Sequence, residues 1–421
     1  MVNELRSLLH ESSENAPYAA FDATALLRAG RSRTRRRRAV AVGTAAAIVA
    51  TVIGGSALAL DRNGPDRATP APPLPQDGRT LHLADATTAD LETVFSHVNE
   101  DLDQGSGQYV DGITTDGLAV FRDGPHGADN VAEMSLVDLE SGGESQLPDL
   151  TYPVNSLLEA TGDRIVYFGG NASTTTTKFG TGVVIFDRAT STWSEVSWPA
   201  LPPTTPVGMS MGPDGRLYVA AYDVPAGTGE GDPNDLMRRP TDLWSVSLSD
   251  PADVRAEGLR VGSFAIDEGH LVWTDGTEPR VFVRDLATGE ETSFDPGPDA
   301  GCNHHGIDLE EDKIVLSLFC KGGGERDDRL QIVTMTGEPV VTIQDASLSG
   351  TTNNGGQVLV YGHGRDQTGH YAYDLDTGTF LRLSTNDSMF GMGGPVTDGY
   401  VLWTEGYEGR NGSTQKIARI P

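Results

Sequence analysis

The chain has 421 residues, 37% of them hydrophobic and 22% charged, a composition typical of a folded protein rather than a disordered one. The formal net charge is −29, from 60 acidic and 31 basic residues; residues 1–38 hold four of the acids and eight of the bases, so residues 39–421 carry 56 acids against 23 bases, a net charge of −33. A surface this acidic repels nucleic acid and anionic lipid, which excludes DNA or RNA binding by this larger part of the chain.

The N-terminal region predicts a membrane anchor. Seven Arg lie between residues 28 and 38, and residues 39–60 are uncharged and mostly Ala, Val, Ile, Leu and Gly, long enough for a helix that spans a bilayer. Because positive residues stay on the cytoplasmic side, we expect a single-pass cell-membrane protein with a cytoplasmic Arg-rich tail and an extracytoplasmic remainder. The alternative is a signal peptide cleaved after the motif Ala57-Leu58-Ala59, which would export the remainder equally.

Residues 61–78 follow the hydrophobic stretch and predict an extended linker. They contain five Pro among small polar residues, and such segments behave as stiff spacers. The remaining residues, 79–421, are expected to form one domain.

A repeat dominates that domain. Seven times, a turn rich in Asp, Asn, Gly or Glu is followed by four mostly apolar, strand-forming residues, and the first residues of these quartets are spaced 47, 52, 54, 43, 44 and 43 apart. This period predicts an all-β fold: a seven-bladed β-propeller of four-stranded antiparallel blades, preceded by one transmembrane helix. The quartets are Leu118–Phe121, Ile165–Phe168, Leu217–Ala220, Leu271–Thr274, Ile314–Ser317, Val358–Tyr361 and Val401–Thr404. A helical or two-domain fold is disfavoured by the 51 Gly and the lack of helical periodicity after residue 105.

A second repeated pattern, of the type Asp-x-x-Thr/Ser-Gly, begins at residues 138, 187, 285 and 374. It follows an apolar strand each time and is interpreted as the hairpin between the third and fourth strands of a blade. The chain ends just after the third strand of unit seven, so we expect Arg79–Leu83 to supply the missing fourth strand and close the ring.

The two cysteines agree with export. Cys302 and Cys320 lie at equal distances from residue 311, inside the turn Glu310-Glu311-Asp312, so a simple hairpin places them opposite each other. This predicts a structural disulfide within unit five, and the alternative is a pair of reduced thiols. There is no C-x-x-C spacing that would indicate redox chemistry.

Few residues are candidates for catalysis or for ligand binding. His304 and His305 precede Asp308 on the expected first strand of unit five and are the candidate ligand-binding residues; adjacent residues of a strand point to opposite faces, which disfavours one shared metal. Gly208-Met209-Ser210-Met211-Gly212 matches a nucleophile elbow, but a turn and a strand follow it instead of a helix, so we place it in the first strand of unit three. We predict no catalytic residue, no metal and no cofactor.

Other features indicate surfaces and packing. Residues 226–241 and 321–328 are rich in Gly, Asp and Arg and are the expected variable loops of a recognition surface. The five Trp are expected to fill gaps between blades rather than to form a carbohydrate platform. Asp101-x-Asp103-x-Gly105 is interpreted as a solvated connection because the later acidic ligands of a calcium loop are missing.

The whole arrangement resembles single-pass membrane proteins of high-GC Gram-positive bacteria that carry an exported propeller of the broad TolB-like or WD40-like kind. The resemblance is carried by Glu4-Leu5-Arg6-Ser7-Leu8-Leu9, by Leu26-Leu27-Arg28-Ala29-Gly30, by the Arg cluster with its Ala-rich span, and by 27 Arg against four Lys. It implies topology more than activity. The Gly-His and Trp-Asp signature of true WD40 repeats is missing, and so is the zinc module of related anti-sigma regulators, since residues 1–38 contain His10 and no Cys.

These observations favour a membrane-tethered, extracytoplasmic propeller for binding, sensing or scaffolding. Its partner would be a protein, peptide or small ligand on one face of the ring, with the tail 1–38 open to a cytoplasmic partner. The alternative is an extracytoplasmic propeller enzyme, a lyase or hydrolase, with its site at the mouth of the central channel. Converging carboxylates or histidines there would favour the enzyme, whereas a broad apolar or aromatic patch on one face would favour the binding module.

Overall fold

The structure is a computed structural model. It describes residues 78–88, 91–99, 107–124, 132–169, 182–201, 204–223, 240–275, 280–296, 302–310, 312–322, 325–352, 355–363, 367–385, 396–397, 399–406 and 413–420. The predicted tail 1–38, membrane span 39–60 and almost all of the linker lie outside these residues, as does Asp101-x-Asp103-x-Gly105. In the part of the chain that the structure describes, no helix is long and apolar enough to cross a membrane.

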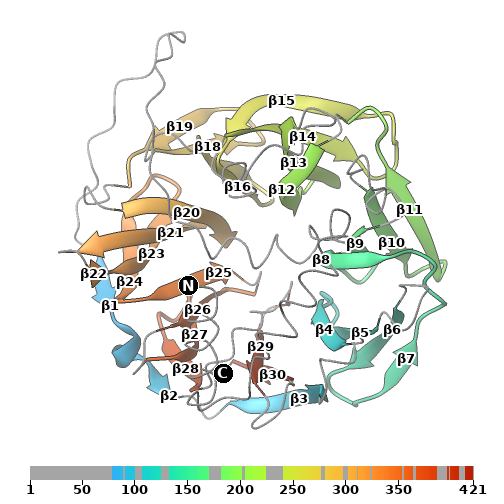
Figure 1. Cartoon of the computed structure of the whole chain (residues 1–421), viewed down its shortest axis with the longest axis horizontal. Helices are drawn as coiled ribbons and strands as arrows, with labels where there is room; N and C mark the ends of the chain where they lie inside the picture. The colour runs from blue at the N-terminus through green and yellow to red at the C-terminus, as the bar shows by residue number, and fades with distance from the viewer. Residues whose placement is uncertain are drawn as a thin grey trace, which may run out of the picture.

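Seven sheets stand side by side around a ring, which confirms the predicted seven-bladed propeller (Figure 1). Blades 1 to 4 each contain four antiparallel strands that follow one another in the chain. They are β4 (Gln108–Ile113), β5 (Leu118–Asp123), β6 (Glu133–Asp138) and β7 (Glu144–Gln146); β8 (Val154–Ala160), β9 (Arg164–Gly169), β10 (Gly182–Asp187) and β11 (Thr192–Ser197); β12 (Thr204–Met211), β13 (Arg216–Asp223), β14 (Thr241–Ser247) and β15 (Val254–Val261); β16 (Ser263–Ile266), β17 (His270–Thr274), β18 (Val281–Asp285) and β19 (Glu291–Phe294).

Blades 5 to 7 include strands from both ends of the described chain. Blade 5 contains β20 (Cys302–Glu310), β21 (Lys313–Gly322), β22 (Glu325–Arg326), β23 (Asp328–Thr334), β24 (Pro339–Asp345) and β1 (Arg79–Leu81). Blade 6 contains β25 (Leu348–Thr352), β26 (Gln357–Gly362), β27 (Gly369–Asp374), β28 (Phe380–Ser384) and β2 (Thr87–Thr88). The described strands of blade 7 are β29 (Tyr400–Gly406), β30 (Ser413–Arg419) and β3 (Glu92–Asn99).

Each predicted quartet forms part of the second strand of its blade, where neighbouring blades cover both faces of the sheet. In β9, for example, Tyr167 packs toward blade 1, whereas Val166 packs toward blade 3 together with Val219. All three side chains are almost fully buried. Continuous apolar runs therefore suit these strands, and each fully buried Val contributes about 1.5–3 kcal/mol to folding.

The Asp-x-x-Thr/Ser-Gly pattern forms the turn between the third and fourth strands, as predicted. The Asp285 carboxylate accepts hydrogen bonds from the backbone N–H of Thr288 at 2.7 Å and from its hydroxyl at 3.0 Å, and Gly289 has a positive φ of 73°. The turn that begins at residue 187 has Ser191 at the glycine position, with φ 53°, and Ser191 is the one non-glycine residue with positive φ among the described residues. This conformation is unfavourable for a residue with a Cβ.

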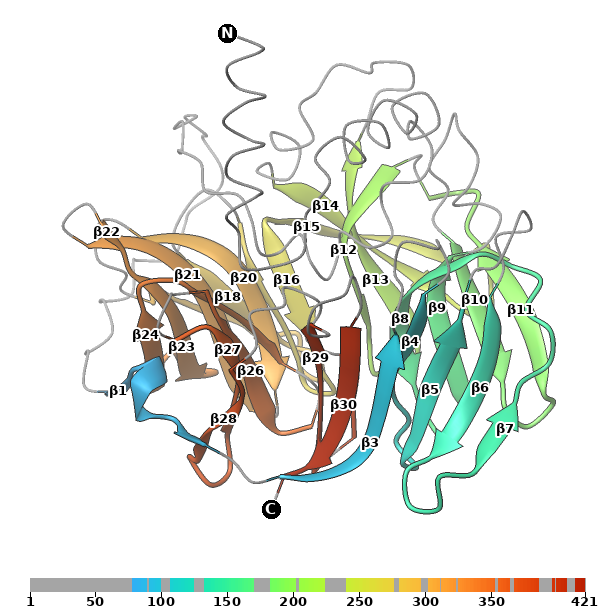
Figure 2. The same ribbon diagram turned by 60° about the horizontal axis from the view of Figure 1, so that its bottom comes forward.

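The ring is closed by β3, not by the segment that the sequence suggested. β3 pairs antiparallel with β30 and completes blade 7, whereas β1 runs parallel to β24 as an extra outer strand of blade 5 (Figure 2). The expectation that Arg79–Leu83 closes blade 7 is wrong because Leu81 and Leu83 are buried in the core shared by blades 5 and 6. The short 3-10 turn η2 (Leu83–Asp85) then leads to β2, so one N-terminal segment lies along three consecutive blades.

The two ends of the blades differ in their connections. At the end that we call the turn face, the connections are short, and even the longest, 248–253, is a tight loop. The connections 124–132, 170–181 and 224–240 all join strands at the opposite end, which we call the loop face and which is the upper end of the blades in Figure 2. In blades 1 to 6 the inner strand starts at the loop face and the second strand ends there, so this face presents the starts and ends of those strands.

Candidate functional site

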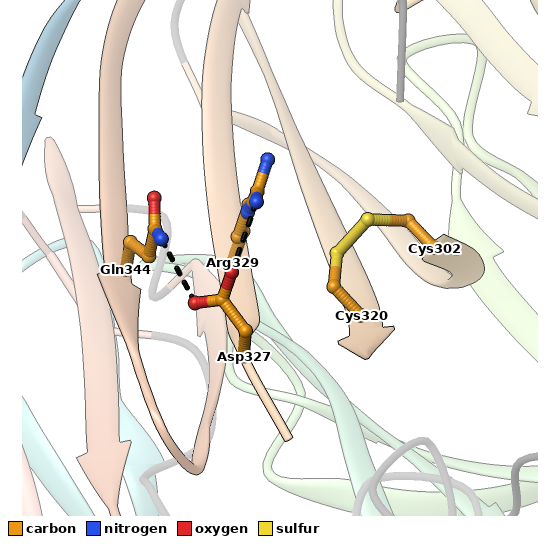
Figure 3. The surroundings of a disulfide bond; sticks show 5 residues. All are labelled: Cys302, Cys320, Asp327, Arg329 and Gln344. Carbon is orange, nitrogen blue, oxygen red and sulfur yellow. Dashed lines mark hydrogen bonds and ion pairs between the residues drawn. A yellow bond between two sulfur atoms is a disulfide. The ribbon is translucent and has the colours of Figure 1, made fainter. Parts of the chain in front are cut away.

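The predicted disulfide is confirmed. Cys302 and Cys320 are register partners on β20 and β21, with Cα atoms 3.9 Å apart, and the bond joins the first two strands of blade 5 at the loop face (Figure 3). Nearby, Asp327 accepts hydrogen bonds from Arg329 at 2.9 Å and from Gln344 at 2.8 Å. These hydrogen bonds connect the end of β22 with β23 and β24. Together with the disulfide, they hold the strands of blade 5 to one another at the loop face.

His304 and His305 lie on β20 as predicted, but their side chains are outside the described part of the structure. The backbone of His304 is paired with Leu318, and a β-bulge follows, because the next paired residue is Gly306. Ligand binding by the two histidines stays a prediction. Among the described residues, no group of three His, Cys, Asp or Glu side chains is placed to hold a metal ion.

Asp308, on the same strand, has an unusual environment. It is only partly exposed on the innermost strand of blade 5, and Thr351 and Thr352 of blade 6 donate hydrogen bonds to it. Burial raises the pKa of Asp308 to about 6, and the two hydrogen bonds act in the opposite direction without cancelling that effect.

The structure describes most of one predicted recognition loop and only the end of the other. Residues 321–328 do not form an irregular loop, because β21 continues to Gly322 and pairs with β22 at the loop face of blade 5 (Figure 2). The Arg326 guanidinium bonds the Asp328 carboxylate at 2.6 Å and lies over the Phe319 ring at 4.8 Å. Residues 226–239 lie outside the described residues.

The structure confirms the predicted strand position of Ser210 and the predicted packing of three Trp residues. Ser210 lies on β12, the first strand of blade 3, so the motif around it is not a nucleophile elbow. Trp198, Trp273 and Trp403 are each 4% exposed and fill space between blades.

A cluster of polar and aromatic side chains lies between blades 6 and 7 at the loop face. Near the middle of this seam, Leu359 and Ala372 of blade 6 meet Val401 and Ala418 of blade 7 in one buried apolar cluster. Side chains alternate along a strand, so the next residues facing the same seam, two positions nearer the loop face, are Tyr361 and His370 on one side and Trp403 and Lys416 on the other. Tyr361 is paired with His370, and Trp403 with Lys416.

We call this layer, with the adjoining loop-face residues, the seam site. Its members are Tyr361, His363 and His370 of blade 6 and Trp403, Glu405 and Lys416 of blade 7. The Tyr361 ring lies 4.4 Å from the His363 ring and 5.0 Å from the His370 ring, measured between centroids. Glu405 accepts hydrogen bonds from Trp403 Nε1 at 2.8 Å and from Lys416 Nζ at 2.7 Å.

One serine joins the seam site from the inner strand of blade 6. Ser349 Oγ lies 3.1 Å from Nε2 of His363, and the serine is 7% exposed, whereas His363 is exposed at the loop face. His370 is 1% exposed, and its Nδ1 has no hydrogen-bond partner among the described residues.

The charge states of the seam site follow from its burial. Burial lowers the pKa of His370 to about 4, although the Glu405 carboxylate acts in the opposite direction. Burial and the positive charge of Arg326 lower the pKa of His363. Burial acts to raise the pKa of Glu405, but hydrogen bonds from Lys416 and Trp403 outweigh it and leave the pKa below its ordinary value. At neutral pH the site therefore holds two neutral imidazoles and one carboxylate–ammonium pair.

Polar groups at other seams form structural contacts. Between blades 1 and 2, Asp111 accepts a hydrogen bond from Tyr167 at 2.8 Å and pairs with Arg122 at 2.6 Å. Between blades 3 and 4 the contacts are mainly apolar, with Trp273 in contact with Tyr218 of the neighbouring blade. Two of the three described histidines whose pKa is lowered, His363 and His370, belong to the seam site, which makes this seam a candidate for function.

Sequence reasoning missed the seam site because its members come from five strands or strand ends in two repeat units. No motif brings them together in the chain. The available signal was weak: His363 lies two positions after the quartet that ends at Tyr361, and Glu405 directly follows the quartet that ends at Thr404.

Comparisons with known proteins support the fold. No family model and no curated protein matches the chain. An oligogalacturonate lyase in complex with manganese is similar with a TM-score of 0.50 and 13% identity, over 80% of this chain and 99% of that one. The β-propeller domain of the Trilobed protease from Pyrococcus furiosus has a TM-score of 0.43 and 13% identity, over 70% and 89%.

A third similar structure is a prolyl endopeptidase, with a TM-score of 0.47 and 15% identity; the match covers 80% of this chain and 48% of that one, so the chain spans about half the length of that enzyme. At these identities the similarity concerns the propeller fold alone.

Proposed function

We propose that the chain is a membrane-tethered, extracytoplasmic propeller that binds a protein, peptide or small ligand on its loop face. The observation that carries this proposal is the asymmetry of the ring: tight turns cover one face, whereas the long connections and the seam site belong to the other. Binding residues concentrate on connections that a rigid scaffold positions, and the seven packed blades supply such a scaffold.

The tether is part of the same proposal and is supported by the sequence. The uncharged stretch 39–60 and the Arg cluster before it favour a single span with the propeller outside the cytoplasm. The disulfide between Cys302 and Cys320 supports this placement, because disulfides persist mainly in oxidising compartments. Ligand occupancy would then be transmitted, if at all, through the single span to residues 1–38.

A second candidate function, a propeller hydrolase, is favoured by one contact. Ser349 Oγ and His363 Nε2 are 3.1 Å apart, and the lowered pKa of His363 keeps its imidazole neutral and able to accept the serine proton. Against it, Ser349 is almost fully buried on a regular strand rather than raised on a strained turn. Labelling with a fluorophosphonate probe decides this point: modification of Ser349 supports the hydrolase, and its absence supports binding alone.

The binding proposal is tested by crosslinking in intact membranes. Partners are identified for the full chain, for a variant with residues 224–240 replaced by a short Gly/Ser connection, and for a matched variant with the turn-face loop 248–253 replaced. We expect the loop-face variant to lose partners that the turn-face variant keeps. Loss of the same partners in the turn-face variant, with the loop-face variant unchanged, contradicts the proposal. Deletion of residues 1–38 shows separately whether the tail has partners of its own.

A further inference from the structure

We propose that the seam site binds a neutral, hydroxyl-rich ligand of the saccharide or polyol type. This inference rests on the proposed binding role of the loop face and names a site and a ligand class for it. The first argument is charge. Residues 39–421 carry a net charge of −33, but the seam site pairs its carboxylate, Glu405, with the ammonium of Lys416 at 2.7 Å. An ionic ligand placed there would add an unpaired charge beside a half-buried ion pair, which is costly.

Neighbouring charges do not change this balance. Arg326 is a further described cation whose positive charge acts on His363, and it is itself paired with Asp328 at 2.6 Å. The two imidazoles of the site are uncharged at neutral pH. The site is therefore electrically balanced in a protein that is otherwise strongly acidic, and it suits a neutral polar molecule.

The second argument is hydrogen-bonding capacity. His370 is 1% exposed, faces the seam and has no partner at Nδ1 among the described residues, and a buried polar atom without a partner is unfavourable. Glu405 accepts hydrogen bonds from Trp403, Lys416 and Ser384, and a carboxylate can accept about four, while Lys416 still has N–H groups to donate. The site thus offers both acceptors and donors. A hydroxyl donates one hydrogen bond and accepts two, so adjacent hydroxyls match this pattern.

The third argument is access. The side chain of Lys416 is 32% exposed and that of Glu405 15% exposed, and His363 is exposed at the loop face. Tyr361 and Trp403 are 6% and 4% exposed, so they form a buried aromatic floor that holds the polar groups in place. A ligand at the loop face would contact His363, Glu405 and Lys416, and neighbouring side chains would have to move for it to reach Nδ1 of the buried His370.

The test uses the full chain in lipid nanodiscs, which avoids sugar-based detergents. Maltotriose, cellotriose and chitotriose are the neutral probes, with spermidine and citrate as charged probes, and binding is measured by saturation-transfer NMR and calorimetry. We expect at least one neutral trisaccharide to bind and neither charged probe to do so at the same site. Binding of a charged probe at the seam site, or the absence of binding by all three sugars, overturns the inference.

Two variants locate the binding. Glu405→Gln removes the carboxylate, and His370→Phe replaces the unpartnered imidazole with an apolar ring that preserves the contact with Tyr361. Each is expected to weaken binding about tenfold or more, the loss of one good hydrogen bond to a charged or buried group. The matched control is Glu290→Gln, which removes one carboxylate from the exposed turn face and is expected to leave affinity unchanged.

Unchanged affinity in both seam variants overturns the inference. Thermal unfolding of each variant checks that the ring is intact, and if one variant is misfolded the other decides. Failure of this inference leaves the proposed function standing when crosslinked partners still depend on residues 224–240, so the two outcomes are distinguishable.

Discussion

Replacing Asp308 by Asn should make the protein more stable at neutral pH. The pKa of Asp308 is about 6 in the folded protein, whereas 3.8 is the ordinary value that applies to the unfolded chain. A raised carboxyl pKa means that the folded state binds the proton more tightly. The ionised carboxylate therefore costs stability, beginning as pH rises above about 3.8 and reaching its full extent above about 6.

The size of the effect follows from the difference in pKa. Two pKa units correspond to about 3 kcal/mol, and because Asp308 keeps partial contact with solvent at the inner edge of the ring we expect about 1–3 kcal/mol. Asn keeps the shape of the side chain and can still accept a hydrogen bond from Thr351. Asp308→Asn should therefore match the unchanged protein near pH 4 and exceed its stability by this amount at pH 7.5.

The assay is guanidinium unfolding followed by tryptophan fluorescence between pH 4 and pH 8, with the disulfide kept oxidised. Asp376→Asn, at an exposed position on the turn face, is the matched control and should change the free energy of unfolding by less than about 0.5 kcal/mol. A stability difference for Asp308→Asn that does not grow with pH, or a loss of stability at pH 7.5, would refute the reasoning.

Three further changes test particular contacts. Replacing Cys302 and Cys320 together by Ser should lower the free energy of unfolding by about 3 kcal/mol, the loop-closure value for a sequence separation of 18, and equal stability of reduced and oxidised protein would contradict this. Ser191→Gly should stabilise by about 0.5–1 kcal/mol because it relieves a positive φ of 53°, and a thermal shift in the opposite direction would show that the turn tolerates serine. Gln415→Leu removes hydrogen bonds of 2.6 and 2.9 Å to the backbone of Val110 across blades 7 and 1 and should cost about 2–4 kcal/mol, as measured by denaturant unfolding against Gln146→Leu as a surface control.

Much of the fold could be predicted from the sequence because its information is local. Each second strand contains an apolar quartet directly after a turn, so β9 and β13 can be predicted without knowledge of any long-range contact. The hairpins are equally local, since Asp285 and Thr288 make their bonds within one turn. The disulfide was predictable because symmetric spacing about a tight turn fixes a cross-strand pair.

The closing strand and the seam site could not be predicted because both depend on contacts between residues that are far apart in the sequence. β3 is a largely exposed outer strand whose sequence, ETVFSHVN, has no regular alternation of polar and apolar residues, so nothing in Glu92–Asn99 distinguishes it from a connection. Arg79–Leu81, more strand-like in its residues, pairs with β24 instead, and only the burial of Leu81 and Leu83 between blades decides this. The seam site depends on His370 and Glu405 meeting across two units, which no spacing in the sequence encodes.

The central claim, a ring of seven blades closed by β3 on β30, is tested most directly by a crosslink between these strands. Val98 and Thr414 are register partners, so cysteines introduced at both positions should form a disulfide under mild oxidation, seen by mass spectrometry of the linked peptides. The pair Thr80→Cys and Thr414→Cys is the control, because Thr80 is partnered with Thr342 of blade 5. The account predicts a link for the first pair and none for the second; a link through residue 80, or none through residue 98, would contradict it.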